Sequence, residues 1–91
     1  MSFYLKDPGA VLDYSINWGA GYLQGGETLS SSIWTISPND MTQNSASNTT
    51  TIASVTVTGG VGGQLYQLTN RVTTSQGRTD ERSITVRVEH R

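Results

Sequence analysis

The chain has 91 residues, with seven acidic and six basic side chains, one histidine and no cysteine, and this length allows one small domain. The absence of cysteine excludes disulfides and thiolate metal sites, and the single histidine, next to last, argues against a catalytic or multi-histidine metal site. A net charge of −1 argues against phosphate-driven nucleic-acid binding, and no apolar run approaches the length of about 18 residues that spans a membrane.

The first ten residues leave two alternatives open. The segment from Ser2 to Pro8 contains apolar residues but no lasting alternation. It either caps the domain as a short edge strand or reaches onto another protein and folds there. It also lacks the basic start and apolar core of a secretory signal, so we expect a protein that is not exported by a signal peptide.

Farther along the chain, apolar and polar residues alternate with a period of two, which is typical of strands with one face on a core. In the second such segment we expect Trp34 and Ile36 to face the core, with Leu29 on the opposite face, because this choice buries more apolar area. The predicted strands are residues 12–18, 28–36, 49–58, 64–74 and 79–88, and the polar stretch 41–48 leaves open a further short edge strand.

Glycine-rich segments separate these strands. Residues 19–27 contain four glycines and predict a loop. Residues 59–63 contain four more, and we interpret them as a tight reversal or a crossover between sheets rather than a flexible hinge. Residues 75–78 predict a hairpin turn in which Gly77 adopts a positive φ.

These elements predict an all-β fold. We expect an antiparallel immunoglobulin-like or fibronectin-III-like β-sandwich of about seven strands, with residues 1–91 as a single domain. Residues 1–10 are its N-terminal arm or edge strand, and residues 89–91 are a polar tail. Tyr66 then occupies the position of a tyrosine corner, with its hydroxyl bonded to a nearby backbone group. Trp18 and Trp34 supply the bulk of a core that has no disulfide.

Asn70 is a polar residue on the predicted inward face of its strand, between Leu68 and Val72. A buried amide is costly unless its groups are paired. We therefore interpret Asn70 as bonding the backbone of a neighbouring strand or loop, with a ligand contact as the alternative. Asp13 and Asp80 would form an acid/base pair only if the first and last strands were neighbours, and we interpret both as solvated carboxylates.

The densest charge cluster runs from Arg78 to Arg82, at the mouth of the final hairpin. One interpretation is a recognition edge for a protein partner. The other is a solvated hairpin with weak cross-strand pairs, such as Asp80 with Arg71 or Arg82.

Two stretches are distinctive: Leu-Thr-Asn-Arg-Val-Thr-Thr at 68–74 and Gly-Arg-Thr-Asp-Glu-Arg-Ser at 77–83. Lys-Asp-Pro at 6–8 and the tryptophan segments at 11–18 and 31–36 precede them. In this order the segments resemble a family of short phage and prophage structural proteins of the fiber–tail adaptor type. The resemblance covers nearly the whole chain and implies an immunoglobulin-like sandwich that serves as a structural part of a virion or of tail assembly.

This resemblance implies a protein that acts through protein–protein contacts and not as an enzyme, located in the virion or, during assembly, in the host bacterial cytoplasm. We expect no cofactor and no metal. The implied partners are other phage structural or tail proteins, or further copies of the chain in a ring or trimer, and neither nucleic acid nor membrane. The opening segment and the charge cluster supply the residues that we expect at the interface: Phe3, Tyr4, Lys6, Arg78, Asp80 and Arg82.

The alternative function is a carbohydrate- or surface-binding module. It requires an exposed aromatic platform, for which Tyr4, Tyr22 and Trp18 are the candidates.

Overall fold

Strands account for all the regular structure in the part of the chain that is described. The computed structural model describes residues 2–89, without the side chains of residues 2 and 3, so the tail residues His90 and Arg91 lie outside it. No helix able to cross a membrane occurs within this range. The strands are β1 Ser2–Lys6, β2 Val11–Asn17, β3 Leu29–Ser37, β4 Met41–Asn48, β5 Ile52–Gly59, β6 Leu65–Thr74 and β7 Thr79–Val88.

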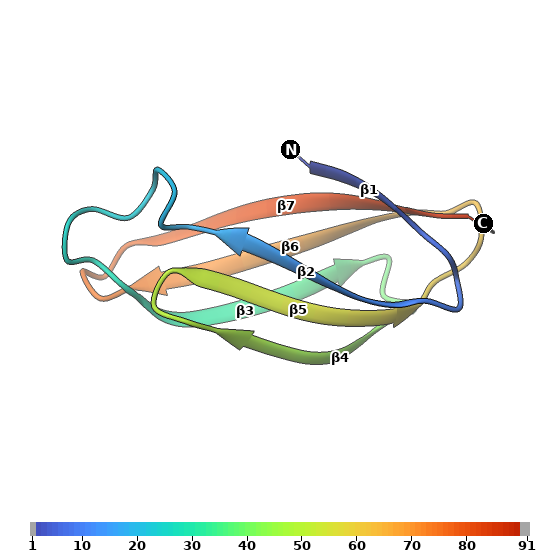
Figure 1. Ribbon diagram of the computed structural model, residues 1–91, viewed down its shortest axis with the longest axis horizontal. Coiled ribbons are helices and arrows are strands. Elements are labelled where there is room, and N and C mark those ends of the chain that lie inside the picture. The colour runs from blue at the N-terminus through green and yellow to red at the C-terminus, as the bar shows by residue number, and fades with distance from the viewer. Residues whose placement is uncertain (1, 90–91) are drawn as a thin grey trace.

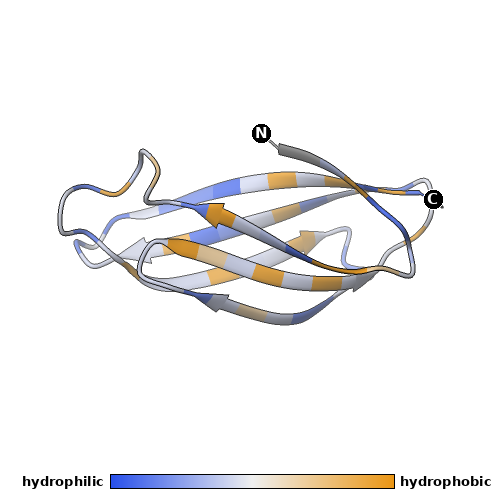
Figure 2. Cartoon of the chain, viewed as in Figure 1, coloured by the Kyte–Doolittle hydropathy of each residue, from blue (hydrophilic) through white to orange (hydrophobic). Residues whose placement is uncertain are grey.

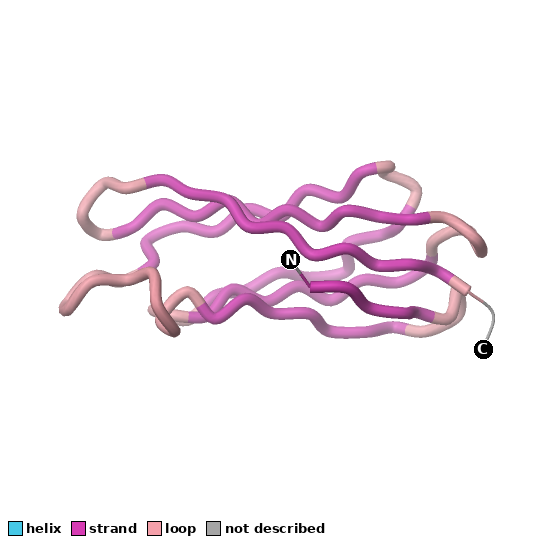
Figure 3. Tube along the Cα trace, turned by 90° about the horizontal axis from the view of Figure 1, so that it is seen from above, coloured by secondary structure: helices cyan, strands magenta, loops and turns pink. Residues whose placement is uncertain are grey.

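Two sheets face each other (Figure 1). One has the strand order β1-β7-β6-β3 and the other the order β2-β5-β4. Figure 3 shows the loops gathered at the two ends of an elongated body of 43 × 21 × 17 Å. The prediction of an all-β sandwich of seven strands is confirmed. Its assignment as immunoglobulin-like or fibronectin-III-like stays a prediction.

One strand pair departs from the antiparallel arrangement that we expected. β1 pairs with β7 in parallel, from Ser2 opposite Ile84 to Lys6 opposite Val88. A turn closed by the bond from the Ala10 amide to the Asp7 carbonyl then carries the chain into the other sheet. Because β1 and β2 belong to different sheets, they do not form a hairpin. In this structure the opening segment is an edge strand, the first of its two alternatives.

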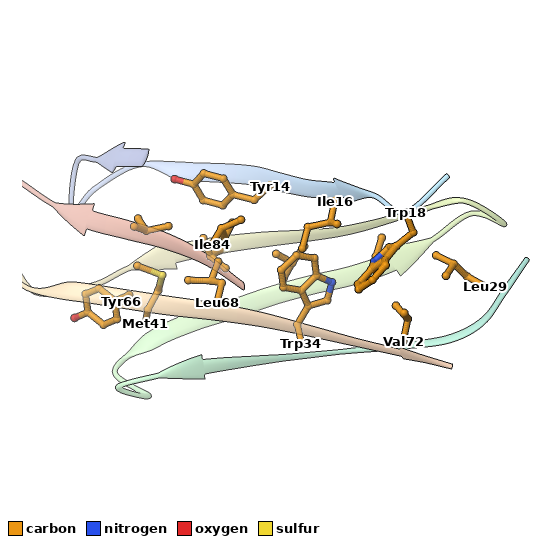
Figure 4. Packing of buried hydrophobic residues seen from close by; sticks show 14 of the residues in the cluster. Tyr14, Ile16, Trp18, Leu29, Trp34, Met41, Tyr66, Leu68, Val72 and Ile84 are labelled. Carbon is orange, nitrogen blue, oxygen red and sulfur yellow. The ribbon is translucent and has the colours of Figure 1, made fainter. Parts of the chain in front are cut away.

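Alternation along the strands builds the core between the sheets, and Figure 2 shows apolar residues recurring along them. Trp18 is completely buried and Trp34 nearly so, which confirms their predicted role as core bulk (Figure 4). The buried hydrophobic residues are Tyr14, Ile16, Trp18, Leu29, Trp34, Met41, Ala53, Val55, Val57, Tyr66, Leu68, Val72, Ile84, Val86 and Val88.

The predicted orientation of β3 is right for Trp34 and wrong for Leu29. Trp34 faces the core and Ile36 is half-buried against it. Leu29 is also buried, although it lies five residues from Trp34 and strict alternation would place it on the other face. The register shifts between Leu29 and Ser31. This β-bulge inserts one residue and reverses the faces on either side of it.

The edge strand β4 confirms the short strand left open at 41–48, with only Met41 of its residues buried. The glycine-rich segment after β5 is a crossover from one sheet to the other, as predicted. A Cβ on Gly60, whose φ is +98°, would lie 2.8 Å from a methyl group of Val88. In the same crossover the amide of Val61 donates to the Tyr66 hydroxyl over 2.7 Å, so the predicted bond from Tyr66 to nearby backbone is confirmed.

Candidate interaction surface

An ion pair between a buried carboxylate and a half-buried guanidinium ties the glycine-rich loop, residues 18–28, to the hairpin between β6 and β7. Glu27 is buried, and its two carboxylate oxygens accept bonds from Arg78 Nη2 at 2.5 Å and Nε at 2.9 Å. The hydroxyl of Thr74 donates to Oε2 over 2.6 Å and the Gln24 amide donates to Oε1 over 3.0 Å. The bonds from Arg78, Gln24 and Thr74, in that order of weight, lower the pKa of the Glu27 carboxyl from 4.5 to about 2.

This ion pair changes the interpretation of the charge cluster. Arg78, predicted as an interface residue, is committed to Glu27 and also donates to the Tyr22 carbonyl over 3.2 Å, with its guanidinium 4.5 Å from the Tyr22 ring centre. Its first role is therefore to hold the loop. The pairing of Glu27 with Arg78 was not predicted, because the two residues lie 51 positions apart in the chain. No local pattern joins two residues so far apart.

Asn70 holds the core tryptophan of the same region. Its side chain is fully buried, and its Oδ1 accepts from Trp18 Nε1 over 2.8 Å. Its Nδ2 donates to Ser32 Oγ over 2.8 Å and to the Ile33 carbonyl over 3.3 Å. The predicted backbone partner is present in the Ile33 carbonyl of β3, whereas the other two bonds go to the side chains of Trp18 and Ser32. Trp18, being buried, cannot be the exposed aromatic platform of the carbohydrate-binding alternative.

Arg82 covers Trp18 from outside. Its guanidinium lies 4.5 Å from the Trp18 ring centre and 5.8 Å from that of Tyr22. Tyr22 in turn packs edge-on against Trp18, with ring centres 5.1 Å apart. Within residues 2–89, Arg82 forms no ion pair with a carboxylate, whereas Arg71 pairs with Glu81 and not with Asp80, the partner we had suggested.

A groove of about 660 Å³ lies between the edge of β2 and the edge of β7. Of its lining residues, Arg82 stacks on Trp18, and Ser15 follows Tyr14, whose ring centre lies 5.0 Å from that of Tyr4. The lining residues are Ser15, Ile16 and Asn17 of β2, Gln67 of β6, and Arg82, Ser83 and Ile84 of β7. The groove is thus apolar at its two isoleucines and polar around them.

The other predicted interface residues lie apart from one another. Tyr4 is 40% exposed on the edge strand β1, and Asp80 is exposed, with its carboxylate accepting from the Glu81 amide over 2.8 Å. Lys6 is fully buried, and its ammonium group donates to the carbonyls of Gly59 and Asp7. Burial lowers the Lys6 pKa, an effect that the nearby Asp7 charge opposes. The side chain of Phe3, which belongs to β1, lies outside the described part of the chain.

Exposed large apolar side chains concentrate at one end of the sandwich. This apolar end lies where β1 leads into β2 and where β5 crosses to β6, and its members are Leu5, Val11, Leu12, Val61 and Leu65. Leu5 and Leu65 are both opposite Arg87 of β7, one on each side. The sequence analysis did not single out this surface.

The hairpin and the groove belong to a stretch of chain that matches a known family. Residues 6–87, which include β2 to β6 and all but the last residue of β7, match the family described as podophage GP4 fiber-tail adaptor protein gp77. No curated protein matches the chain. The match covers most of the chain and includes both distinctive stretches at 68–74 and 77–83. The chain belongs to the phage fiber-tail adaptor family.

Proposed function

We propose that the protein is a non-catalytic structural part of the phage tail, which joins a fiber to the tail by protein–protein contacts alone. The observation that carries this proposal is the family match over residues 6–87. The family implies contact with other phage tail proteins and a place in the virion. Before assembly, the protein would reside in the cytoplasm of the host bacterium.

The sandwich supports contacts on two separate surfaces. The apolar end carries five exposed large apolar side chains, and exposed apolar surface marks protein interaction sites where it is contiguous. The groove lies along the side of the body, between the sheet edges of β2 and β7. A protein that joins two others needs two such surfaces at once. Self-association in a ring or trimer would multiply the contacts by avidity.

No observation favours the carbohydrate-binding alternative. Of its candidate aromatic residues, Trp18 is buried and Tyr22 is half-buried under Arg78. Tyr4 is therefore the one exposed residue of the three, and a single ring does not form a platform. Titration of glycans against the labelled protein, followed by NMR, would reveal any binding of this kind.

The test is to purify particles from phage-producing cells and to identify their proteins by mass spectrometry. We expect this chain in particles at a constant ratio to tail proteins, and we expect a tagged copy to capture a tail protein and a fiber protein together. Repeated absence of the chain from complete, fibered particles would refute the proposal.

A further inference from the structure

Half of one edge of the four-stranded sheet has no neighbour. β7 pairs with β6 along nearly its whole length, but on its other side β1 covers only Ile84 to Val88. Within residues 2–89, no strand pairs with Thr79–Ser83 on that side. An unpaired sheet edge exposes backbone donors and acceptors that another extended chain can match.

The groove gives an added strand room beside the end of this free edge that comprises Arg82 and Ser83. Its walls are β2 at Ser15–Asn17 and the β7 edge at Arg82–Ile84, and its volume is about 660 Å³. The buried side chains of Ile16 and Ile84 meet it from the core, and serine, asparagine and glutamine surround them. Five residues of extended chain, the length of the free edge, span about 17 Å.

Charge indicates the chemistry of the occupant. Arg71, Arg78 and Arg87 each form an ion pair with a glutamate, and Lys6 is buried with its ammonium group on backbone carbonyls. Among the basic residues that the structure describes, this leaves Arg82 as the exposed one without an acidic partner. Its guanidinium is already oriented by stacking on Trp18, and a planar guanidinium is suited to bind a carboxylate in two-pronged fashion.

We propose that the groove binds an extended, acidic segment of another tail protein, which adds as a strand to the free edge of β7 at Thr79–Ser83 and places one carboxylate on Arg82. This inference rests on the proposed function, because it supplies the contact through which the adaptor holds one of its partners. A second copy of this chain and a glycan are the competing occupants.

Single-cysteine labelling tests the position of the partner, since the chain has no cysteine of its own. Ser15 lines the groove, and Ser47 is its matched control, because the two lie in one cross-strand row through Ser54. We expect maleimide to label Ser15→Cys quickly in the free protein and at least about tenfold more slowly in particles. Ser47→Cys should react at similar rates in both. Equal labelling of Ser15→Cys in free protein and particles would overturn the inference.

A photocrosslinker on the same cysteine identifies the occupant. Attached to Ser15→Cys in assembled particles, it should join the chain to a segment of another tail protein that contains aspartate or glutamate. A crosslink to a second copy of this chain, or to a segment without an acidic residue, would overturn the inference.

Substitutions of Arg82 test the charge. We expect Arg82→Met to lower the amount of protein retained in particles by about tenfold or more. Arg82→Lys keeps the charge but loses the planar fork and the stacking on Trp18, so its retention should lie between those of wild type and Arg82→Met. Arg71→Met on the neighbouring strand β6 is the control, since Arg71 is an exposed arginine that pairs with Glu81 and does not line the groove. If Arg82→Met is retained as well as wild type, no carboxylate of the partner rests on Arg82, and the acidic occupant is refuted.

A second variant keeps the test decisive if Arg82→Met does not fold. Ser15→Trp fills the groove from an exposed position, with Ser47→Trp as its control, and only the first should reduce retention. Equal retention of both would count against the groove. Absence of the wild-type chain from particles would instead refute the proposed function, so the two failures are distinguishable.

Discussion

Two buried tyrosine hydroxyls differ in their hydrogen bonding. The Tyr66 hydroxyl accepts from the Val61 amide, whereas the Tyr14 hydroxyl has no partner among the described atoms. Burial of an unpaired hydroxyl is unfavourable, and loss of a paired one removes a favourable contact. We expect Tyr66→Phe to lower the free energy of unfolding by about 1–2 kcal/mol, and Tyr14→Phe to leave it unchanged or raise it by about 1 kcal/mol.

Each variant loses only the hydroxyl oxygen of one tyrosine. Urea unfolding of both variants therefore checks this prediction directly. A loss of stability in Tyr14→Phe equal to that in Tyr66→Phe would mean that both hydroxyls are paired.

The amide of Asn70 is the polar centre of the core. Replacement by alanine leaves the Trp18 indole N–H without its acceptor and opens a small void. We expect Asn70→Ala to destabilise the domain by about 2–4 kcal/mol. The neighbouring Thr69, which shares a bond with Ser83 at the half-exposed outer face, is the control, and Thr69→Ala should cost about 1 kcal/mol or less. Thermal unfolding followed by tryptophan fluorescence gives both values.

At the scale of elements, the glycine-rich loop depends on one carboxylate. The pKa of Glu27 is about 2 in the folded chain and near 4.5 without its partners. The ionised carboxylate therefore stabilises the fold fully above about pH 4.5, and this contribution is lost as the pH falls towards 2. We expect the melting temperature of Glu27→Gln to be lower than that of wild type at pH 7, and the difference to shrink on acidification through this window.

The exposed Glu81→Gln variant, which loses only the surface pair with Arg71, is the control for this pH profile and should track wild type closely. If the melting temperature of Glu27→Gln stayed below that of wild type by the same amount from pH 7 to pH 2, protonation of the Glu27 carboxylate would not be linked to unfolding.

The crossover between the sheets requires glycine at one position and merely favours it at another. Both Gly60 and Gly63 have positive φ, but only a Cβ on Gly60 would meet other atoms, with Val88 at 2.8 Å and Met41 at 3.2 Å. We expect Gly60→Ala to cost about 2–4 kcal/mol and Gly63→Ala about 1 kcal/mol, since the second adds backbone strain without a clash. Chemical denaturation of both variants distinguishes them, and equal losses would contradict the packing at Gly60.

The elements show where sequence pattern is sufficient. The extent of β7 and the inward faces of β5 and β6 follow from period-two alternation, which is a local property. Alternation does not predict the burial of Leu29, because a single inserted residue in a bulge reverses the pattern without changing the composition. Alternation does not predict the burial of Lys6 either. Its ammonium group bonds the carbonyls of Gly59 and Asp7, and Gly59 belongs to a distant segment that no local rule connects to Lys6.

The candidate site was less predictable than the fold for the same reason. Arg82 was expected at an interface from its charged neighbours alone, and that expectation is retained in the proposal for the groove. The groove itself depends on how β2 of one sheet lies against β7 of the other, and this is a matter of tertiary arrangement. Arg78 looked equivalent to Arg82 in the sequence, yet Glu27 gives it a different role.

For the whole molecule, the distance between the two surfaces leads to a prediction. The apolar end and the groove share none of their residues. We expect Leu65→Ser to lower retention in particles by about fivefold to tenfold. The protein that is still retained should form the crosslink through Ser15→Cys with the same yield as wild type. Ile33→Ser is the control, since Ile33 is 61% exposed on β3, away from the apolar end. If Leu65→Ser abolished the crosslink in the retained protein as well as lowering retention, the apolar end and the groove would belong to one continuous interface.

The parallel direction of β1 has a practical consequence for anyone who labels this protein. Because Ser2 is opposite Ile84 and the two strands run the same way, chain added ahead of β1 is aimed along β7 towards Ser83 and Arg82. An N-terminal affinity tag would thus be held beside the groove at an effective concentration on the order of millimolar and would compete with any natural occupant. A tag joined behind β7 starts from the opposite end of that strand. The position of the tag therefore decides whether a binding experiment finds the groove free or already blocked.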